Sequence, residues 1–335
     1  MTRPEDAPLL VRIPNWLGDL VLSLPILESV AAEGPAVFVG PEAFRDVLEP
    51  RFPGVRYLAT SRAARWAPLP AIRALRPRAA LLLTESLSSA VLAWLAGVPQ
   101  RIGYDAEGRG LLLTRRVRRA GAPRSTARTA EYRELAAAAG IVPRTEIPTL
   151  KPTAEESEGA SSALERAGLR GAPYLLLAPG ASYGPAKQWE PKRFALAGAG
   201  IARRTGRAVV VVGGPEDREA AASAAREARG LGARAIDLAG TTSLGDLMGI
   251  VAGADGVISN DSGVMHLAAA FHRPTVGVFG STSPVWTSAS APWVSNLYAA
   301  YPCSPCYRRT CPIGYGCLRS IGPEEASRAL ERLLP

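Results

Sequence analysis

The sequence lacks the features that carry a chain into or across a membrane. Its first residues, MTRPEDAPLLVRIPNWLGD, contain only a short apolar run and no small-residue cleavage site, so they do not resemble a secretory signal. The most apolar long window, residues 79–98, is interrupted by Glu85 and by several Ser and Thr residues, whereas a membrane span needs about 20 mostly apolar residues. We therefore expect a cytoplasmic protein.

Two phosphate-binding fingerprints are also missing. The turn after the first apolar run, Pro14 to Asp19, contains no G-x-G-x-x-G, and no G-x-x-x-x-G-K-[ST] occurs in the chain. The first absence argues against a dinucleotide-dependent oxidoreductase, and the second excludes a P-loop enzyme. Histidine is scarce as well: both histidines, His266 and His272, lie in the second half. A general base from the first half would therefore have to be a carboxylate.

Lysine is rare although the chain is basic. Of 39 basic residues only three are lysines, and the net charge is +9. The densest arginine segment has no interleaved aromatic platform for stacking bases and no nucleic-acid motif, so we expect no nucleic-acid partner. It is suited instead to an anionic partner such as a phosphorylated glycolipid at a membrane surface, unless the arginines merely reflect compositional bias. Its nine arginines are Arg101, Arg109, Arg115, Arg116, Arg118, Arg119, Arg124, Arg128 and Arg133.

What is present predicts two α/β domains. At 335 residues the chain exceeds one typical core, and short aliphatic runs alternate with Ala-rich helical stretches, as in parallel sheets covered by helices. Residues 142–157 contain three prolines and no apolar periodicity, which is typical of a linker. We expect domains over residues 1–150 and 151–322 and a terminal helix over 323–335. Predicted strands cover Leu9–Ile13, Ala36–Val39, Ala79–Leu83, Tyr174–Ala178, Ala208–Val212, Ala235–Leu238, Gly256–Ser259 and Thr275–Phe279, and predicted helices cover Leu20–Ala32, Ser86–Ala96, 191–204, 216–229, 244–253 and 263–271.

In the first half, the candidate site is the turn that contains Asn15, Trp16, Gly18 and Asp19. It follows a predicted strand, where open α/β sheets bind their ligands. Gly18 permits close backbone approach, and Asp19 falls in the first helical turn, facing the ligand. The alternative is that Asp19 only caps the helix and favours its positive end.

Three strand-to-helix turns are candidates in the second half. The loop PGASYGPAKQW offers backbone N–H groups and the positive charge of Lys187 to a phosphate. Glu216, after the next strand, is placed to accept from ribose hydroxyls, although helix capping explains it nearly as well. The strongest element is ISNDSGVMHLAA, where Asp261, Ser262 and Gly263 begin a helix whose amides point at a ligand. His266 beside them is either a contact or a histidine satisfied on the helix flank.

All four cysteines, Cys303, Cys306, Cys311 and Cys317, lie in YPCSPCYRRTCPIGYGC. In a cytosolic protein such clustering favours a structural Zn or Fe–S site over disulfides, although the spacing matches no standard zinc finger. Free or reversibly oxidised thiols are the alternative. Nothing ties this cluster to the chemistry of the other motifs.

Three ordered motifs resemble those of the ADP-heptose:lipopolysaccharide heptosyltransferases of glycosyltransferase family nine, and most resemble the heptosyltransferase II branch. They are PNWLGDLVLSLPIL, PGASYGPAKQW and NDSGVMHLAAAFHRPTVGVFGSTSP, and the cysteine-rich tail is similar to tails of some members. The resemblance implies an α/β GT-B fold, with two Rossmann-like domains facing each other across a cleft. The first domain would bind a lipid A–inner core acceptor, and the second would bind ADP-heptose.

The resemblance also implies roles for individual residues. Asp19 aligns with the family's catalytic base, Lys187 with its diphosphate-binding lysine, and Glu216 with its ribose-binding acid. Ser182 stands where relatives vary, and the arginine-rich region has little local match. Asp261, Ser262, Gly263 and His266 align with the segment that holds the donor sugar and diphosphate.

The resulting hypothesis is an inverting transfer in one displacement that requires no catalytic cofactor, because Lys187 and the helix amides meet the charge that develops on ADP. Two other enzymes remain open, a relative that uses another sugar nucleotide and one that adds the first heptose. A non-catalytic nucleotide-sugar-binding protein is the alternative of another class.

Overall fold

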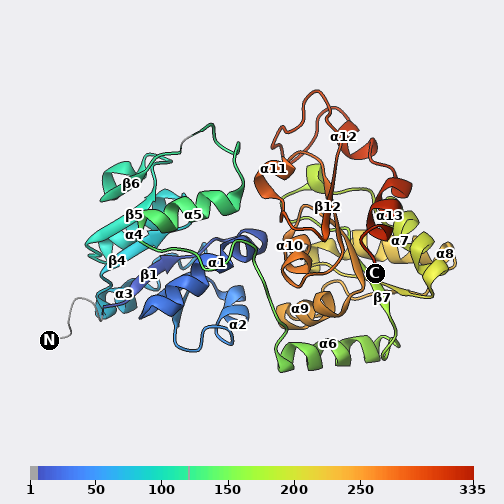
Figure 1. Ribbon diagram of the computed structural model, residues 1–335, viewed down its shortest axis with the longest axis horizontal. Coiled ribbons are helices and arrows are strands. Elements are labelled where there is room, and N and C mark those ends of the chain that lie inside the picture. Colours follow the sequence, from blue (N-terminus) through green and yellow to red (C-terminus); the bar gives the residue numbers. More distant parts are fainter. Residues whose placement is uncertain (1–6, 120) are drawn as a thin grey trace. The chain divides into compact units, whose positions relative to one another are not determined.

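The computed structural model describes residues 7–119 and 121–335. The chain divides into two compact units, Met1–Pro148 (unit 1) and Thr149–Pro335 (unit 2) (Figure 1). Each unit contains a six-stranded sheet in which every neighbouring pair of strands is parallel. Parallel sheets need helical crossovers, and both units have helices between their strands.

Unit 1 orders its strands β3-β2-β1-β4-β5-β6. The central strands are apolar and almost fully buried, as strands covered on both faces should be. The chain leaves β1 toward one edge and returns to β4 on its other side, so the strand order switches at the carboxyl end of β1, which is where such sheets bind ligands. The strands are β1 Leu9–Arg12, β2 Ala36–Pro41, β3 Arg56–Thr60, β4 Ala79–Leu82, β5 Gln100–Tyr104 and β6 Arg115–Val117, and the helices are α1 Leu17–Glu33, α2 Arg45–Leu48, α3 Leu69–Leu75, α4 Leu87–Leu95 and α5 Arg128–Ala138, with 3-10 turns at Glu42–Phe44 and Arg109–Leu112.

Unit 2 orders its strands β12-β11-β10-β7-β8-β9. The switch of strand order lies between β7 and β10, and the backbone there pairs Leu175 with Gly256 and Ala178 with Ser259. The strands are β7 Tyr174–Ala178, β8 Ala208–Val211, β9 Ala235–Asp237, β10 Gly256–Asn260, β11 Thr275–Phe279 and β12 Val294–Tyr298, and the helices are α6 Ala154–Arg166, α7 Pro191–Thr205, α8 Arg218–Gly230, α9 Leu244–Gly253, α10 Gly263–Ala270, α11 Pro284–Thr287, α12 Gly316–Arg319 and α13 Pro323–Glu331, with 3-10 turns at Pro185–Lys187 and Pro215–Asp217.

The predicted strands all exist, within one or two residues at their ends. Two predicted helix starts were displaced. Helix α1 begins at Leu17 rather than Leu20, and α8 begins at Arg218 because Glu216 lies in a separate 3-10 turn. The strands that sequence patterning missed, β3, β5, β6 and β12, each contain exposed or half-buried positions and so lack a continuous apolar run.

The segment expected to be a linker is partly ordered structure of unit 2. The backbone N–H of Leu150 donates to the carbonyl of Ala270 at 2.8 Å. Helix α6 begins at Ala154 with a capping box, in which Thr153 and Glu156 each accept from the other's backbone N–H. The segment therefore begins a helix that packs along α9 (Figure 1).

The terminal helix α13 is part of the core of unit 2. Ala326, Ala329 and Leu330 are at most 1% exposed, and the helix packs against α7 (Figure 1). Within residues 7–119 and 121–335, no helix has both the length and the apolar character needed to cross a bilayer. The apolar window at 79–98 instead forms β4 and α4.

Candidate functional site

The loop after β7 is held in place by a buried asparagine at the end of β10. Asn260 is fully buried, its Oδ1 accepts from the backbone N–H of Trp189 at 2.9 Å, and its Nδ2 donates to the carbonyl of Pro179 at 2.7 Å. Gly180 is required by close packing, because a Cβ there would lie 2.1 Å from the carboxyl carbon of Asp217. The loop that carries Ser182 and Lys187 is therefore fixed at both of its ends, and Ser182 is exposed on it.

Lys187 is paired with Asp261 in a buried cluster. Its Nζ lies 2.6 Å from Oδ2 of Asp261, and their side chains are 12% and 3% exposed. The same carboxylate oxygen accepts from the hydroxyls of Thr282 at 2.6 Å and Thr287 at 3.1 Å. Burial opposes ionisation of Asp261, but the charge of Lys187 and the hydrogen bonds from Lys187 and Thr282, acting together with His266, outweigh it and lower the pKa of the carboxyl. Asp261 thus fixes Lys187, a role that the sequence did not reveal.

His266 lies one helical turn into α10 and is 4% exposed. Its Nε2 is 3.9 Å from Oδ1 of Asp261, and its Nδ1 has no hydrogen-bond partner among the described residues. Burial lowers the pKa of His266 to about 4, although the carboxylate of Asp261 acts in the opposite direction. The imidazole is therefore neutral at pH 7 and retains one ring nitrogen for a further contact.

The remaining donor-side residues follow neighbouring strands. Ser262 is the residue before α10, and its hydroxyl lies 3.0 Å from that of Ser259; Gly263 is the first residue of the helix. Glu216 is exposed after β8, while its neighbour Asp217 accepts from the N–H of Gly214 at 2.9 Å. Because β10, β7 and β8 are adjacent and parallel, their carboxyl ends meet at one edge of the sheet. The predicted donor-binding residues of unit 2 therefore gather at that edge.

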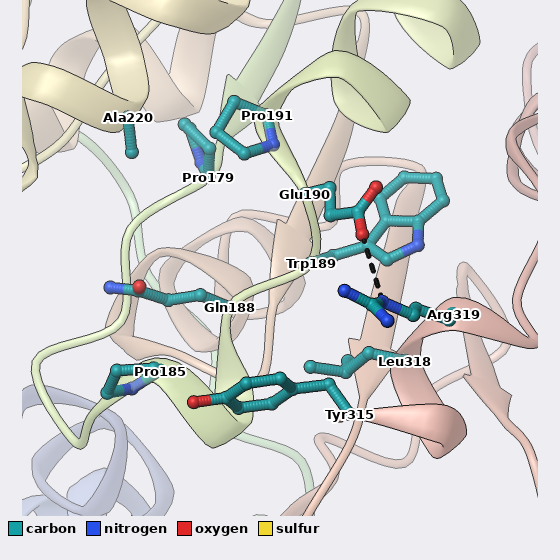
Figure 2. A pocket seen from close by; sticks show the side chains of 10 residues that line it. All are labelled: Pro179, Pro185, Gln188, Trp189, Glu190, Pro191, Ala220, Tyr315, Leu318 and Arg319. Atoms are coloured by element: carbon teal, nitrogen blue, oxygen red, sulfur yellow. Dashed lines mark ion pairs between the residues drawn. The ribbon is translucent and has the colours of Figure 1, made fainter. Parts of the chain in front are cut away.

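A separate pocket of about 250 Å³ lies beside the base of this loop (Figure 2). Its rim contains an ion pair of 3.4 Å between Glu190 and Arg319. None of the predicted donor-binding residues lines it, so we do not assign the donor to this pocket. It is lined by Pro179, Pro185, Gln188, Trp189, Glu190, Pro191, Ala220, Tyr315, Leu318 and Arg319.

In unit 1, Asp19 lies in the first turn of α1, next to the start of α5. Nε of Arg128 is 3.5 Å from Oδ1 of Asp19, whose side chain remains 26% exposed. Trp16 is the N-cap residue of α1 and is 48% exposed, and Oδ1 of Asn15 accepts from Arg12 at 2.7 Å. Gly18 is the second residue of the helix. The turn thus presents Asp19 with a partly accessible carboxylate and an arginine neighbour.

The arginine-rich segment is divided between the interior and the surface of unit 1, so only part of it is available to an anionic partner, and binding of such a partner stays a prediction. Arg109 is fully buried and donates to the carbonyls of Thr84 at 2.5 Å and Tyr104 at 2.9 Å. Burial lowers the pKa of Arg109 to about 10. A count of arginines along the chain does not show which side chains point into the interior and which face solvent.

An ion-pair network accounts for two more of these arginines. Nη1 of Arg128 lies 2.9 Å from Glu85 and 2.7 Å from Glu131, and Arg119 pairs with the same two carboxylates. Burial of Glu85 opposes its ionisation, but Arg128 and Arg119 lower its pKa. The network joins the loop after β4 to α5 and fixes the arginine that neighbours Asp19. The arginines of the segment that are exposed are Arg115, Arg116, Arg118 and Arg124.

The four cysteines line one small cavity of about 10 Å³. Cys317 is buried, Cys306 and Cys311 are half-buried, and Cys303 is exposed; within the described ranges all four are free thiols. In the same ranges, no three His, Cys, Asp or Glu side chains already stand at metal-ligand geometry. The sequence motif therefore brings the thiols together around a cavity without closing a metal site.

Comparisons with known proteins place these features in a family context. The model of glycosyltransferase family 9 (heptosyltransferase) matches residues 70–315. Lipopolysaccharide heptosyltransferase 2 of Escherichia coli K12 is 30% identical over 312 residues, which cover 83% of this chain and 84% of that protein. Lipooligosaccharide heptosyltransferase 2 of Haemophilus influenzae is 29% identical over 309 residues, which cover 83% and 85%.

Solved structures agree with the sequence comparisons. The structure of E. coli ADP-heptose LPS heptosyltransferase II matches with a TM-score of 0.78 and 26% identity, covering 97% of this chain and 98% of that one. A family 9 glycosyltransferase of Veillonella parvula matches with a TM-score of 0.80 and 20% identity, covering 99% and 98%. The α/β fold class of the GT-B type, expected from the sequence, is confirmed.

Proposed function

This chain belongs to glycosyltransferase family 9, and we propose that it transfers heptose from ADP-heptose to the inner core of lipopolysaccharide, as the second heptose. The proposal extends to this chain the activity named for its relatives, two of which are called heptosyltransferase 2. Its main support is the gathering of Lys187, Glu216 and the start of α10 at one edge of the unit 2 sheet.

The donor would bind at that edge. Lys187 supplies a positive charge fixed by Asp261, and the free amides at the start of α10 add the positive end of a helix dipole at Ser262 and Gly263. Together they match a diphosphate. Glu216 would accept from the ribose hydroxyls, and Ser182 would contact the phosphates from its exposed position on the loop. Nδ1 of His266, which has no hydrogen-bond partner among the described residues, would be available for the heptose or the diphosphate.

The acceptor would bind to unit 1, on the turn formed by Asn15, Trp16 and Gly18. Asp19 would take the proton of the acceptor hydroxyl as that oxygen attacks the anomeric carbon of heptose. The bond from that carbon to the diphosphate oxygen breaks in the same displacement, so ADP leaves and the configuration is inverted. A carboxylate that is partly exposed suits a general base.

The charge that develops on departing ADP would be met by the chain itself. Lys187 and the α10 amides would lie beside the diphosphate as negative charge develops on it, and donors fixed in advance cost no reorganisation during the reaction. No step of the proposed reaction uses a cofactor. We still predict, from the sequence, that the protein acts in the cytoplasm and contacts the inner membrane peripherally.

The test is a transfer assay that pairs several sugar nucleotides with several acceptors. ADP-heptose, ADP-glucose and UDP-glucose would each be offered with lipid A core acceptors that carry no heptose or one heptose, and the products would be identified by mass spectrometry. We expect transfer from ADP-heptose to the acceptor that already carries one heptose. Transfer only to the heptose-free acceptor would identify an enzyme that adds the first heptose.

Two further outcomes would contradict the proposal. Transfer from a different sugar nucleotide would make the chain a family member of other donor specificity. Binding of ADP without transfer to any acceptor would support a non-catalytic binding protein. Asp19→Asn, assayed in parallel, provides the background rate of a chain with an intact donor side.

A further inference from the structure

The proposed transfer uses none of the cysteines, yet the fold brings all four to one place. Cys303, Cys306, Cys311 and Cys317 line a single cavity although 14 positions separate the first from the last. Its volume of about 10 Å³ is close to the space that one water molecule occupies. The cavity therefore has room for a single ion.

The backbone around Cys311 turns its N–H groups toward the sulfur. Tyr315 donates its N–H to Sγ of Cys311 at 3.2 Å. The turn is made by Gly314 and Tyr315, which have positive φ values of 88° and 59°. Backbone N–H groups that donate to a cysteine sulfur are outer contacts of the kind that orient a metal ligand.

We propose that the four thiolates bind one Zn²⁺ ion as a closed, structural site. Zinc accepts four cysteine sulfurs in tetrahedral geometry, and the cavity fits one ion. Each thiol gives its proton to solvent as the metal–sulfur bond forms. The described residues hold no ready-made ligand set, so the sulfurs must move inward, and binding would tighten the loop between Cys303 and Cys317.

The loop that would tighten packs directly on the loop that carries Lys187. The N–H of Ala186 donates to the carbonyl of Arg309 at 3.0 Å, and the N–H of Ser281 donates to the carbonyl of Ala186 at 3.1 Å. The hydroxyl of Ser304 donates to the carbonyl of Gly280 at 2.6 Å. Zinc would therefore hold the residue next to Lys187 in place.

Close packing at Gly184 strengthens this connection. Its φ is +139°, and a Cβ at this position would lie 2.8 Å from the carbonyl oxygen of Arg309. The two loops thus meet backbone to backbone, with no flexible side chain between them to absorb a shift. Loss of zinc would be transmitted to Lys187, and this second step rests on the proposed function.

The metal is tested first, and independently of transfer. The full chain would be produced in medium supplemented with zinc and iron, purified under reducing conditions without chelator, and analysed by inductively coupled plasma mass spectrometry. We expect about one zinc ion per chain. Cys306→Ser and Cys311→Ser should each lose the bound zinc, whereas Ile313→Ser should retain it. Ile313 is the matched control because it lines the same cavity without being a ligand.

Three results would overturn the proposal. The first is a wild-type chain that carries no metal and takes up none on reconstitution with zinc. The second is a chain that holds several iron atoms with inorganic sulfide in place of zinc. The third is a chain whose four cysteines are paired as disulfides when it is isolated from the reducing cytoplasm of the producing cells. The wild-type measurement decides the question even if a variant fails to fold.

The connection to the donor loop is tested by ADP affinity, measured by calorimetry before and after zinc removal with a thiol-reactive reagent and a chelator. We expect several-fold weaker binding without zinc and recovery when zinc is restored. Unchanged ADP affinity in a chain that binds zinc would overturn the second step and leave the metal site. Zinc with no ADP binding by any form would contradict the proposed donor site instead.

Discussion

Units 1 and 2 each place a carboxylate at the start of a helix that follows a central strand, but they use it differently. Asp261 in unit 2 has a side chain that is 3% exposed and lies 2.6 Å from Lys187. Asp19 in unit 1 has a side chain that is 26% exposed and lies 3.5 Å from Arg128. Comparable strand-to-helix turns therefore give a saturated carboxylate in one unit and an accessible one in the other.

The difference shows why only one of the two suits proton transfer. Oδ2 of Asp261 already accepts from Lys187, Thr282 and Thr287, so its function is to fix a cation. Arg128, the cation beside Asp19, also pairs with Glu85 and Glu131, and the side chain of Asp19 remains 26% exposed. A carboxylate must be within reach of a substrate proton to act as a base, and this condition favours Asp19.

The largest expected effect comes from removing the accessible carboxylate. Asp19→Asn should lower the turnover number by about 10²–10⁴-fold, because a positioned base contributes that much. ADP affinity should stay within a few fold of wild type, since donor binding is assigned to unit 2. Steady-state kinetics and calorimetry measure the two effects. If Asp19 only stabilises the start of α1, the variant will melt earlier and yet turn over normally.

Breaking the saturated pair should affect binding more than chemistry. Lys187→Met should weaken ADP binding by about 10–100-fold, the worth of a charge-assisted contact to phosphate. It should also lower stability by about 3 kcal/mol, because the buried carboxylate of Asp261 loses its cation.

The double variant Lys187→Met/Asp261→Asn separates these two effects. Removing the orphaned charge should recover part of the stability while ADP binding stays weak. Recovery of ADP affinity in the double variant would show that Lys187 acts only through folding.

The buried histidine of unit 2 predicts a pH dependence of stability. An unfolded histidine has a pKa near 6.5, and burial lowers that of His266 to about 4. Between these values the unfolded chain binds a proton that the folded chain excludes. Stability is thus fully present above pH 6.5 and is lost as the pH falls toward 4. We expect the free energy of unfolding to be about 2 kcal/mol lower at pH 5 than at pH 7.

Urea denaturation at the two pH values provides the measurement. His266→Asn should flatten the dependence between pH 7 and pH 5. The matched control is His272→Asn, which changes the only other histidine, an exposed residue, and should retain the slope. Equal slopes in both variants would assign the pH dependence to other groups.

The smallest effect is expected at the exposed carboxylate after β8. Glu216→Gln should weaken ADP binding by about 2–10-fold, because it removes a charge but leaves an acceptor for the ribose hydroxyls. Asp217→Asn is the contrasting variant. The Asp217 side chain packs against Gly180 and accepts a hydrogen bond from the N–H of Gly214, so this substitution should reduce thermal stability instead of ADP affinity. A larger loss of ADP affinity in Asp217→Asn than in Glu216→Gln would reverse the assignment.

The sequence predicted those parts of the fold that depend on local apolar runs. Ala208-Val-Val-Val-Val212 gives a central strand of unit 2, and four of these residues form β8. The sequence did not predict short edge strands such as β6. Two of the three residues of β6 are exposed arginines, which show no strand-like alternation of apolar and polar residues. The terminal helix was predicted, but its place in the core was not, because packing against α7 is a long-range contact.

By itself the sequence determined the apolar strands with several of the helices between them, the strand ends at which polar residues appear, and the motifs that mark the family. These depend on neighbours along the chain, where hydrophobic period and turn residues act locally. Only the tertiary structure decided which charges are available. It buried Arg109, paired Lys187 with Asp261, left Asp19 partly exposed and gathered four thiols around one cavity. The physical reason is that burial and charge pairing depend on residues far apart in sequence, and both set the chemistry of a side chain.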